Sequence, residues 1–239
     1  KKLASGLGDT KLISMTENPY SAKAYCTKRV GFVFPVYYGG LPLIVEQFIE
    51  KVKLPDDLYL FAIATCGISY GNALHQVLSI ITNREYHMSY LNYVMTVNSN
   101  LIRYRKVNHI TKKLNCSDQK TEIILQEIEE MTQYNHYIRK PISELVSHYY
   151  QKRFSEIDHS FYVNDTCNRC GICAKVCAVK NIDLVDGKPI FLHQCEMCLS
   201  CIQYCPQIAI NYKKRTRKRE RYHNPSVSAE DMIYGRLQR

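Results

Sequence analysis

Two runs of cysteines constrain this chain more than any other feature of its sequence. Residues 167–177 read CNRCGICAKVC and residues 195–205 read CEMCLSCIQYC, and in both runs two, two and three residues separate the successive cysteines. Each cysteine of the first run therefore has a counterpart at one constant offset in the second, from Cys167 with Cys195 to Cys177 with Cys205, and Ile182 has its counterpart in Ile210. This regularity indicates a duplicated cysteine-rich unit.

Three kinds of site compete for these sulfurs. A structural zinc ion takes two separated C-x₂-C pairs and has no use for the third cysteine of each run. A disulfide framework needs an oxidising compartment, and bonds across such short spacings are strained. A [4Fe–4S] cube offers four iron corners, and a C-x₂-C-x₂-C loop can wrap three of them. The spacing therefore favours two [4Fe–4S] clusters.

In the bacterial two-cluster arrangement, the fourth cysteine of each run ligates the other cluster. Pro206 follows the last cysteine, as that arrangement expects, whereas Ala178 stands at the equivalent place in the first run. Such crossed ligation holds the clusters close enough for an electron to pass between them. The predicted ligands are Cys167, Cys170, Cys173 and Cys205 for the first cluster, and Cys195, Cys198, Cys201 and Cys177 for the second.

The overall composition is that of a globular protein. Hydrophobic residues make up 46% of the 239 residues, so the chain can bury a sizeable core. No apolar run approaches the roughly 18 residues of a membrane span, and the N-terminal KKLASGLGD lacks the apolar core of a signal peptide. We therefore expect a soluble, cytoplasmic protein without membrane contact, in which eleven cysteines indicate metal or redox chemistry.

More than half of the net charge of +10 lies near the C-terminus, where segment 213–221 has seven basic residues and one acidic residue. Such a run can bind an acidic partner, can lie beside the negatively charged clusters and raise their reduction potentials, or can be solvated. The sequence has no zinc finger, helix-turn-helix or aromatic stacking platform, so we do not expect nucleic acid as a partner.

The part of the chain before the cysteine runs alternates between buried-strand and helical patterns, which is typical of a parallel sheet with helices on both faces. The predicted strands are 30–36, 58–65, 90–97 and, more weakly, 11–15, and the predicted helices between them are 43–52 and 72–81. Ligands of such sheets bind at the carboxyl ends of the strands, where VYYGGLP (36–42) and TCGISYGNA (65–73) lie. Their glycines allow a flat ring to approach and Tyr37 or Tyr38 could stack on it, although spacing alone favours ordinary strand-to-helix turns.

This order of parts resembles that of the flavodoxin–ferredoxin fusions called EFR-type ferrodoxins, which are found in anaerobes. The likeness rests on PVYYGGLP, ATCGISYGNAL, the cysteine block and RYHNP (221–225), and it runs from about residue 1 to 225. It implies a flavodoxin-like doubly wound parallel sheet in 1–157, a two-cluster ferredoxin domain of short hairpins and two short helices in 158–212, and a basic tail in 213–239. The apolar residues expected around the clusters are Val163, Ile172, Val176, Ile182, Ile190, Ile202, Ile208 and Ile210.

The resemblance also implies a flavin site. Flavodoxins enclose the ring of FMN with the two loops named above, so the candidate flavin residues are Tyr37, Tyr38, Gly39, Thr65, Cys66 and Gly67. A flavodoxin begins with a strand and a phosphate-binding loop, whereas this chain begins within what resembles the helix that follows that loop. Either the chain is a fragment of a longer protein or its flavin domain is degenerate, and we favour the fragment. FMN is then expected in the intact protein and not in these 239 residues by themselves.

The predicted function is electron transfer between the two clusters, an FMN of the intact protein and redox partner proteins. We predict no catalytic residue, because no acid, base or nucleophile constellation stands out. Two alternatives remain open at the level of the sequence: a flavin-dependent reductase of a small substrate with a built-in ferredoxin module, and a redox-sensing protein that uses its basic tail as a contact.

Overall fold

The computed structural model describes residues 1–16, 27–105, 108–135 and 137–234, and it divides the chain into two compact units. The sheet unit comprises Lys1–Val97 and His109–Tyr149, and the cysteine unit comprises Asn98–Asn108 and Tyr150–Gln238. The chain therefore leaves the sheet unit for a short segment after its third strand, returns to it, and then builds the rest of the cysteine unit.

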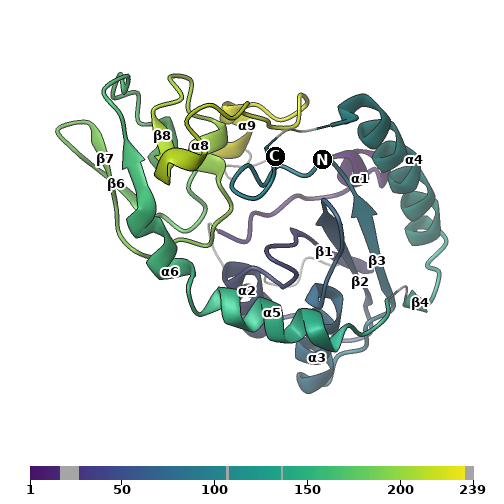
Figure 1. The fold of residues 1–239 in the computed structure, drawn as a ribbon. Helices are drawn as coiled ribbons and strands as arrows, with labels where there is room; N and C mark the ends of the chain where they lie inside the picture. Colours follow the sequence, from purple (N-terminus) through teal and green to yellow (C-terminus); the bar gives the residue numbers. More distant parts are fainter. Residues whose placement is uncertain (17–26, 106–107, 136, 235–239) are drawn as a thin grey trace. The chain divides into compact units, whose positions relative to one another are not determined.

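A parallel β-sheet forms the centre of the sheet unit (Figure 1). Its strands are β1 (Arg29–Pro35), β2 (Tyr59–Cys66), β3 (Tyr90–Met95) and β4 (Tyr134–Asn135), and they lie side by side in this order. Helices α2 (Leu43–Lys51) and α3 (Ala73–Asn83) connect the first three strands, α4 (Ile110–Glu129) follows β3, and α1 (Lys2–Gly6) and α5 (Pro141–Gln151) lie near the two ends of the unit's sequence.

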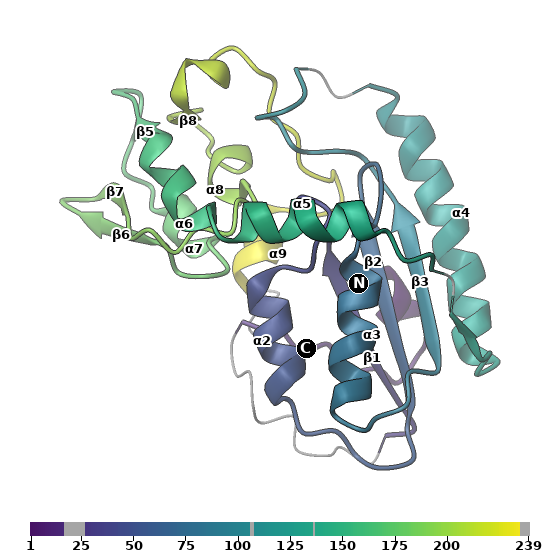
Figure 2. The same cartoon turned by 60° about the horizontal axis from the view of Figure 1, so that its bottom comes forward.

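The side chains of β2 alternate between two hydrophobic cores, because successive residues of a strand point to opposite faces. On one face Ala62 and Ala64 pack with Phe34 of β1 and with Ile49 and Leu74 of α2 and α3. On the other face, Tyr59, Phe61, Ile63, Tyr90, Val94, Ile124 and Ile128 form the second core, and the last two come from α4. Figure 2 shows α2 and α3 on one side of the sheet and α4 on the other. This α/β arrangement of a parallel sheet between helices confirms the coarse fold prediction.

The weakly predicted strand at residues 11–15 is wrong. These residues form no strand, and the side chains of Leu12 and Ile13 are about half exposed, at 50% and 46%. A strand is stabilised by a hydrogen-bonded neighbour, and β1 at the edge of the described sheet pairs only with β2. The apolar pattern of 11–15 was therefore not sufficient to make it a strand.

The cysteine unit is built from short elements. They are α6 (Phe154–Ile157), the 3₁₀ turn Asp158–Ser160, β5 (Phe161–Val163), α7 (Ile172–Lys175), β6 (Ile182–Val185), β7 (Lys188–Phe191), α8 (Ser200–Gln203), β8 (Ile210–Tyr212), the 3₁₀ turn Lys213–Arg215 and α9 (Ala229–Tyr234). β6 and β7 form an antiparallel hairpin, and β5 pairs antiparallel with β8. In each two-stranded sheet, one strand comes directly after a cysteine run: β6 after the first run and β8 after the second.

The repeat of the sequence is also a repeat of the backbone. Helix α7 begins at Ile172 and α8 at its counterpart Ser200, and β6 begins at Ile182 and β8 at its counterpart Ile210. Residues in the left-handed region recur at the same offset, in the pairs Arg169 and Met197, Gly171 and Leu199, and Lys180 and Ile208. Non-glycine residues rarely adopt this conformation, so its recurrence indicates that both copies bend the chain in the same way.

Within the described part of the chain, no helix combines the length and the apolar character needed to cross a membrane.

Neighbouring isoleucines of α4 provide a test of the second core. Ile124 is fully buried, at 0% exposure, whereas Ile123 is 52% exposed. We expect Ile124→Ala to lower the free energy of unfolding by about 2–4 kcal/mol, because it leaves a cavity between α4 and the sheet. Ile123→Ala should cost less than about 1 kcal/mol. Urea unfolding followed by circular dichroism measures both variants, and equal losses would contradict this packing.

Candidate metal centre

Four cysteines from both runs line one cavity of the cysteine unit. The cavity measures about 330 Å³, including the solvent at its mouth, and its walls contain Cys167, Cys170 and Cys173 of the first run together with Cys205 of the second. Gly187 of the β6–β7 turn, Pro189 of β7 and Ile210 of β8 also line it. The structure thus brings together the four residues that the sequence assigned to the first cluster.

The remaining four cysteines also form a group. Burial raises the pKa of the Cys201 thiol well above its ordinary value, and the charges of Cys198, Cys195 and Cys177 raise it further. The pKa of Cys195 is raised to about 12, mainly by burial and in part by Cys198 and Cys177. Cys177 of the first run therefore lies among three cysteines of the second. Cys173, which belongs to the other group, is also within electrostatic reach of Cys201.

The sulfurs are too widely spaced for a ready-made zinc site. Zn–S bonds of about 2.3 Å in a tetrahedron place the sulfurs about 3.8 Å apart. Among the described residues, no three of the eight cysteines have ligand atoms within 4.8 Å of one another, and all eight are described. None of them forms a disulfide in the described structure.

Backbone N–H groups point to the sulfurs at equivalent positions of the two copies. The amide of Asn181 donates to Cys177 Sγ at 3.2 Å, and the amide of Ala209, its counterpart in the second copy, donates to Cys205 Sγ at 3.3 Å. The amide of Met197 donates to Cys195 Sγ at 3.2 Å. Hydrogen bonds to the charged form of a ligand favour that form, so these amides suit thiolates.

Of the apolar residues predicted to shield the clusters, Val176, Ile182, Ile202 and Ile210 are buried and Val163 and Ile172 are half-buried. The prediction is wrong for Ile190 and Ile208, which are 41% and 45% exposed. Ile190 lies at the middle of the short strand β7, whose side chains alternate between faces, and its neighbour Pro189 takes the inward position. Ile208 lies at the left-handed residue before β8 and points outward.

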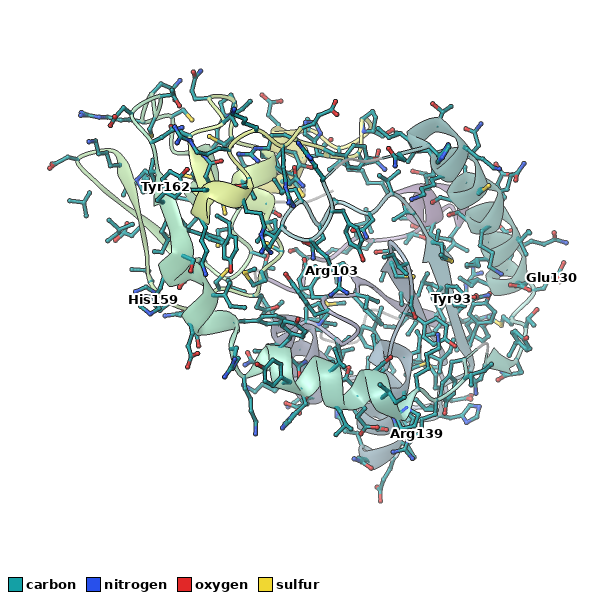
Figure 3. The ribbon with its side chains drawn as sticks, viewed as in Figure 1. Tyr93, Arg103, Glu130, Arg139, His159 and Tyr162 are labelled. Atoms are coloured by element: carbon teal, nitrogen blue, oxygen red, sulfur yellow. The ribbon has the colours of Figure 1, made fainter. Side chains whose placement is uncertain are left out.

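A buried aspartate stabilises the segment that leads into the second cysteine run. Asp158 is 1% exposed, and its two carboxylate oxygens bind the side chains of Asn181 at 2.8 Å and His193 at 2.7 Å. His159, labelled in Figure 3, stacks on His193 with a distance of 3.6 Å between ring centroids. The carboxylate of Asp158 and the imidazoles of His159 and His193 each have an oxygen or nitrogen atom within 4.8 Å of the others. Because both oxygens of Asp158 already accept hydrogen bonds, the group serves as a structural connection.

The segment RYHNP (221–225) packs against the second copy of the repeat. The guanidinium of Arg221 donates from Nη2 to Ile210 O at 3.1 Å and to Asn211 Oδ1 at 3.0 Å, and from Nη1 to Thr216 O at 3.1 Å. The amide of Tyr222 donates to Gln203 Oε1 at 2.8 Å. His223 stacks on Tyr204, with ring centroids 4.7 Å apart.

The sequence singled out this segment by its resemblance to a family but predicted no role for it. An arginine that packs into the fold cannot be distinguished by its sequence from the exposed arginines of the same basic run.

Another residue of the basic run holds the 98–108 segment. Arg219 donates from Nη1 to the carbonyl oxygens of Leu101, Ile102 and Tyr104, the last two at 2.9 and 3.3 Å. Gln203 Nε2 donates to Ser99 O at 2.6 Å. Part of the basic run is therefore structural, whereas Lys214, Arg215, Arg217 and Lys218 are exposed or lie at the surface.

The candidate flavin residues gather at the carboxyl ends of β1 and β2. The amide of Val36 donates to Thr65 O at 2.9 Å, and the amide of Asn72 donates to Gly39 O at 2.7 Å, so the two loops contact each other. Tyr37, Tyr38, Gly39, Thr65 and Gly67 are half-buried. Cys66 is the buried last residue of β2, and burial raises the pKa of its thiol to about 11. A neutral thiol in that position acts as a small core residue.

Of the other two cysteines, Cys116 lies exposed on α4 and Cys26 lies outside the described residues.

No protein-family model matches the chain, and no curated protein and no solved structure matches it significantly.

The contact between the two loops requires a glycine at position 71. Gly71 has a φ of +56°, and a Cβ there would overlap the carbonyl group of Gly39. Gly8 has a φ of +74° with nothing within 4 Å of such a Cβ, so it is a matched control for the backbone conformation alone. We expect Gly8→Ala to cost about 1 kcal/mol of unfolding free energy and Gly71→Ala about 3 kcal/mol or more. Equal costs in thermal or urea unfolding would contradict the close approach of the loops.

Proposed function

We propose that this protein transfers electrons through two [4Fe–4S] clusters held in its cysteine unit, which would then be a two-cluster ferredoxin domain. The observation that carries the proposal is the grouping of the cysteines: each group of four takes three sulfurs from one run and one from the other. Two groups of four cysteines that the sequence repeat relates to each other would suit two identical cofactors.

The donor set supports iron and sulfide over zinc. Thiolates are the ligands of Fe–S clusters, and C-x₂-C-x₂-C followed by a distant cysteine is the two-cluster spacing. Burial raises the pKa of the Cys173 thiol to about 11, so a bound cation is needed to keep that sulfur as a thiolate near neutral pH. The backbone amides directed at Cys177 Sγ and Cys205 Sγ also suit thiolate ligands of such a cluster.

The bound clusters supply one-electron redox chemistry. The two proposed sites would lie next to each other, since Cys173 of one group is within electrostatic reach of Cys201 of the other. Val176 and Ile202, both at 0% exposure, exclude water from the interior of the unit. The amides of Asn181, Met197 and Ala209 stabilise negative charge on the sulfurs and so make reduction easier.

The two sites differ in their access to solvent. Cys170 of the first group is exposed, whereas in the second group Cys177 and Cys201 are buried and Cys195 and Cys198 are half-buried. Electron transfer to a partner falls steeply with distance, so the first site is the one through which we expect electrons to enter or leave the cysteine unit.

The sheet unit is proposed to hold an FMN in the intact protein, which would exchange electrons with the clusters. Support comes from the position of the two glycine-containing loops at the carboxyl ends of parallel strands, where such folds bind cofactors. Tyr37, Tyr38, Gly39, Thr65, Cys66 and Gly67 remain the candidate flavin residues.

Anaerobic purification or reconstitution tests the cluster content. We expect about eight irons and eight acid-labile sulfides per chain, a number that follows from two [4Fe–4S] clusters. Zinc in place of iron, or the eight thiols paired as cystines, would refute the proposal. Cys116→Ser, at an exposed cysteine of α4, should leave the iron content unchanged and is the control for loss of an unrelated thiol.

Paired substitutions test whether ligation is crossed. Cys167→Ala with Cys205→Ala removes two ligands of one proposed cluster, so about half of the iron should remain. Cys167→Ala with Cys177→Ala removes one ligand from each cluster, so both should be lost or weakened. Ligation confined to each run predicts the opposite ranking. Iron analysis and the EPR spectrum of the reduced protein read out both variants.

A further inference from the structure

Arg221 is a half-buried cation with one unused hydrogen-bond donor. Its Nη1 and Nη2 atoms bind three acceptors around β8, as described above. Its Nε atom is buried and has no hydrogen-bond partner among the described residues. A charged donor left unpaired away from water is destabilising, so a buried one in a native structure usually has an acceptor, and that acceptor need not be part of the chain.

The acceptors of Arg221 place it beside the first cluster site. Ile210, whose carbonyl oxygen it binds, is itself in the wall of the cavity that Cys167, Cys170, Cys173 and Cys205 line. Asn211, its second acceptor, follows directly in β8.

Arg221 also lies near sulfurs of both groups. Burial lowers the pKa of its guanidinium, and the thiolates of Cys205 and Cys201 act in the opposite direction. Cys205 belongs to the first group of four and Cys201 to the second. The guanidinium is therefore within electrostatic reach of both cluster sites, and it remains charged at any physiological pH.

We propose that Arg221 is the cation that sets the reduction potentials of the two clusters, with its Nε–H donating to a sulfur of the bound centre. The inference rests on the proposed function and adds a residue to it. A fixed positive charge in a half-buried position stabilises the more negative, reduced state of a nearby centre, and therefore raises its potential. The three hydrogen bonds of the other guanidinium nitrogens hold the charge in place, so that no reorganisation accompanies reduction.

This assignment divides the basic run by role. Arg221 acts on the clusters, Arg219 holds the 98–108 segment, and Arg217 is exposed. Solvent and salt screen an exposed charge, so Arg217 should have little influence on either potential. Arg217→Gln is therefore the matched control, because it removes the same charge from a nearby position of the same run.

The test compares midpoint potentials of the anaerobically loaded full chain. We expect Arg221→Gln to lower the equilibrium constant for one-electron reduction of at least one cluster about tenfold or more. The midpoint potential of that cluster should then fall by about 59 mV or more. Arg221→Lys, which keeps a charge without the planar fork, should shift it less than Arg221→Gln does. Arg217→Gln should change that equilibrium constant less than about threefold. Equal shifts for Arg221→Gln and Arg217→Gln would overturn the proposal.

A second measurement starts from the wild-type protein. Pulsed EPR of the reduced wild-type protein, grown with arginine labelled with ¹⁵N in the guanidinium, should show a nitrogen coupled to the cluster spin. Arg221→Lys should abolish that coupling. No coupling in the wild type, or a coupling that survives the substitution, would refute the hydrogen bond to sulfur.

The proposed function and the proposed role of Arg221 can be refuted separately. A chain that binds no iron and sulfide under anaerobic conditions refutes the proposed function before any potential is measured. A chain that binds about eight irons but whose potentials do not respond to Arg221 leaves the electron-transfer function intact and removes only the role of this residue.

Discussion

The cysteine unit depends on the meeting of two chain segments that are copies of each other in sequence. Neither run of cysteines contributes a whole group of four, because Cys177 leaves the first run for the second group and Cys205 does the reverse. The two antiparallel sheets, β5 with β8 and β6 with β7, hold the copies in this relation. Any change that separates the copies would therefore disassemble both sites at once.

Electrostatics then decides what can occupy these sites. Buried thiols such as Cys201 resist ionisation in the absence of a cation, as their raised pKa values show. In the proposed state, a bound metal centre would supply the positive charge that ionises them, and the amides of Asn181 and Ala209 would stabilise the resulting negative charge on the sulfurs. The Arg221 guanidinium would add a full positive charge to these partial ones. Donors from several parts of the chain would then surround an anionic centre.

What the sequence revealed follows from the range of the interactions involved. Cysteine spacing is a local property and strand periodicity extends over a few residues, so the duplicated unit and the three main strands of the sheet could be recognised. The failed strand at 11–15 shows the limit of periodicity, since a strand also needs a neighbour. Arg219, Arg221 and Gln203 make contacts with segments far from them in sequence or in a separate turn, and a run of basic residues carries no information about which member packs inward. For the same reason, the sequence did not indicate that segment 98–108 belongs to the cysteine unit.

The sizes of the elements explain why such a unit needs its ligands. Helices α7 and α8 have four residues each and the strands have three or four, which is too short for independent stability in water. In the sheet unit, by contrast, buried side chains of β2 fill two continuous cores between longer helices. Where a protein cannot bury enough apolar surface, metal coordination supplies folding free energy in its place. Under the proposed function, the cluster sites would therefore be the structural core of the cysteine unit as well as its redox centre, with the buried aspartate, the arginines and the backbone amides around that core.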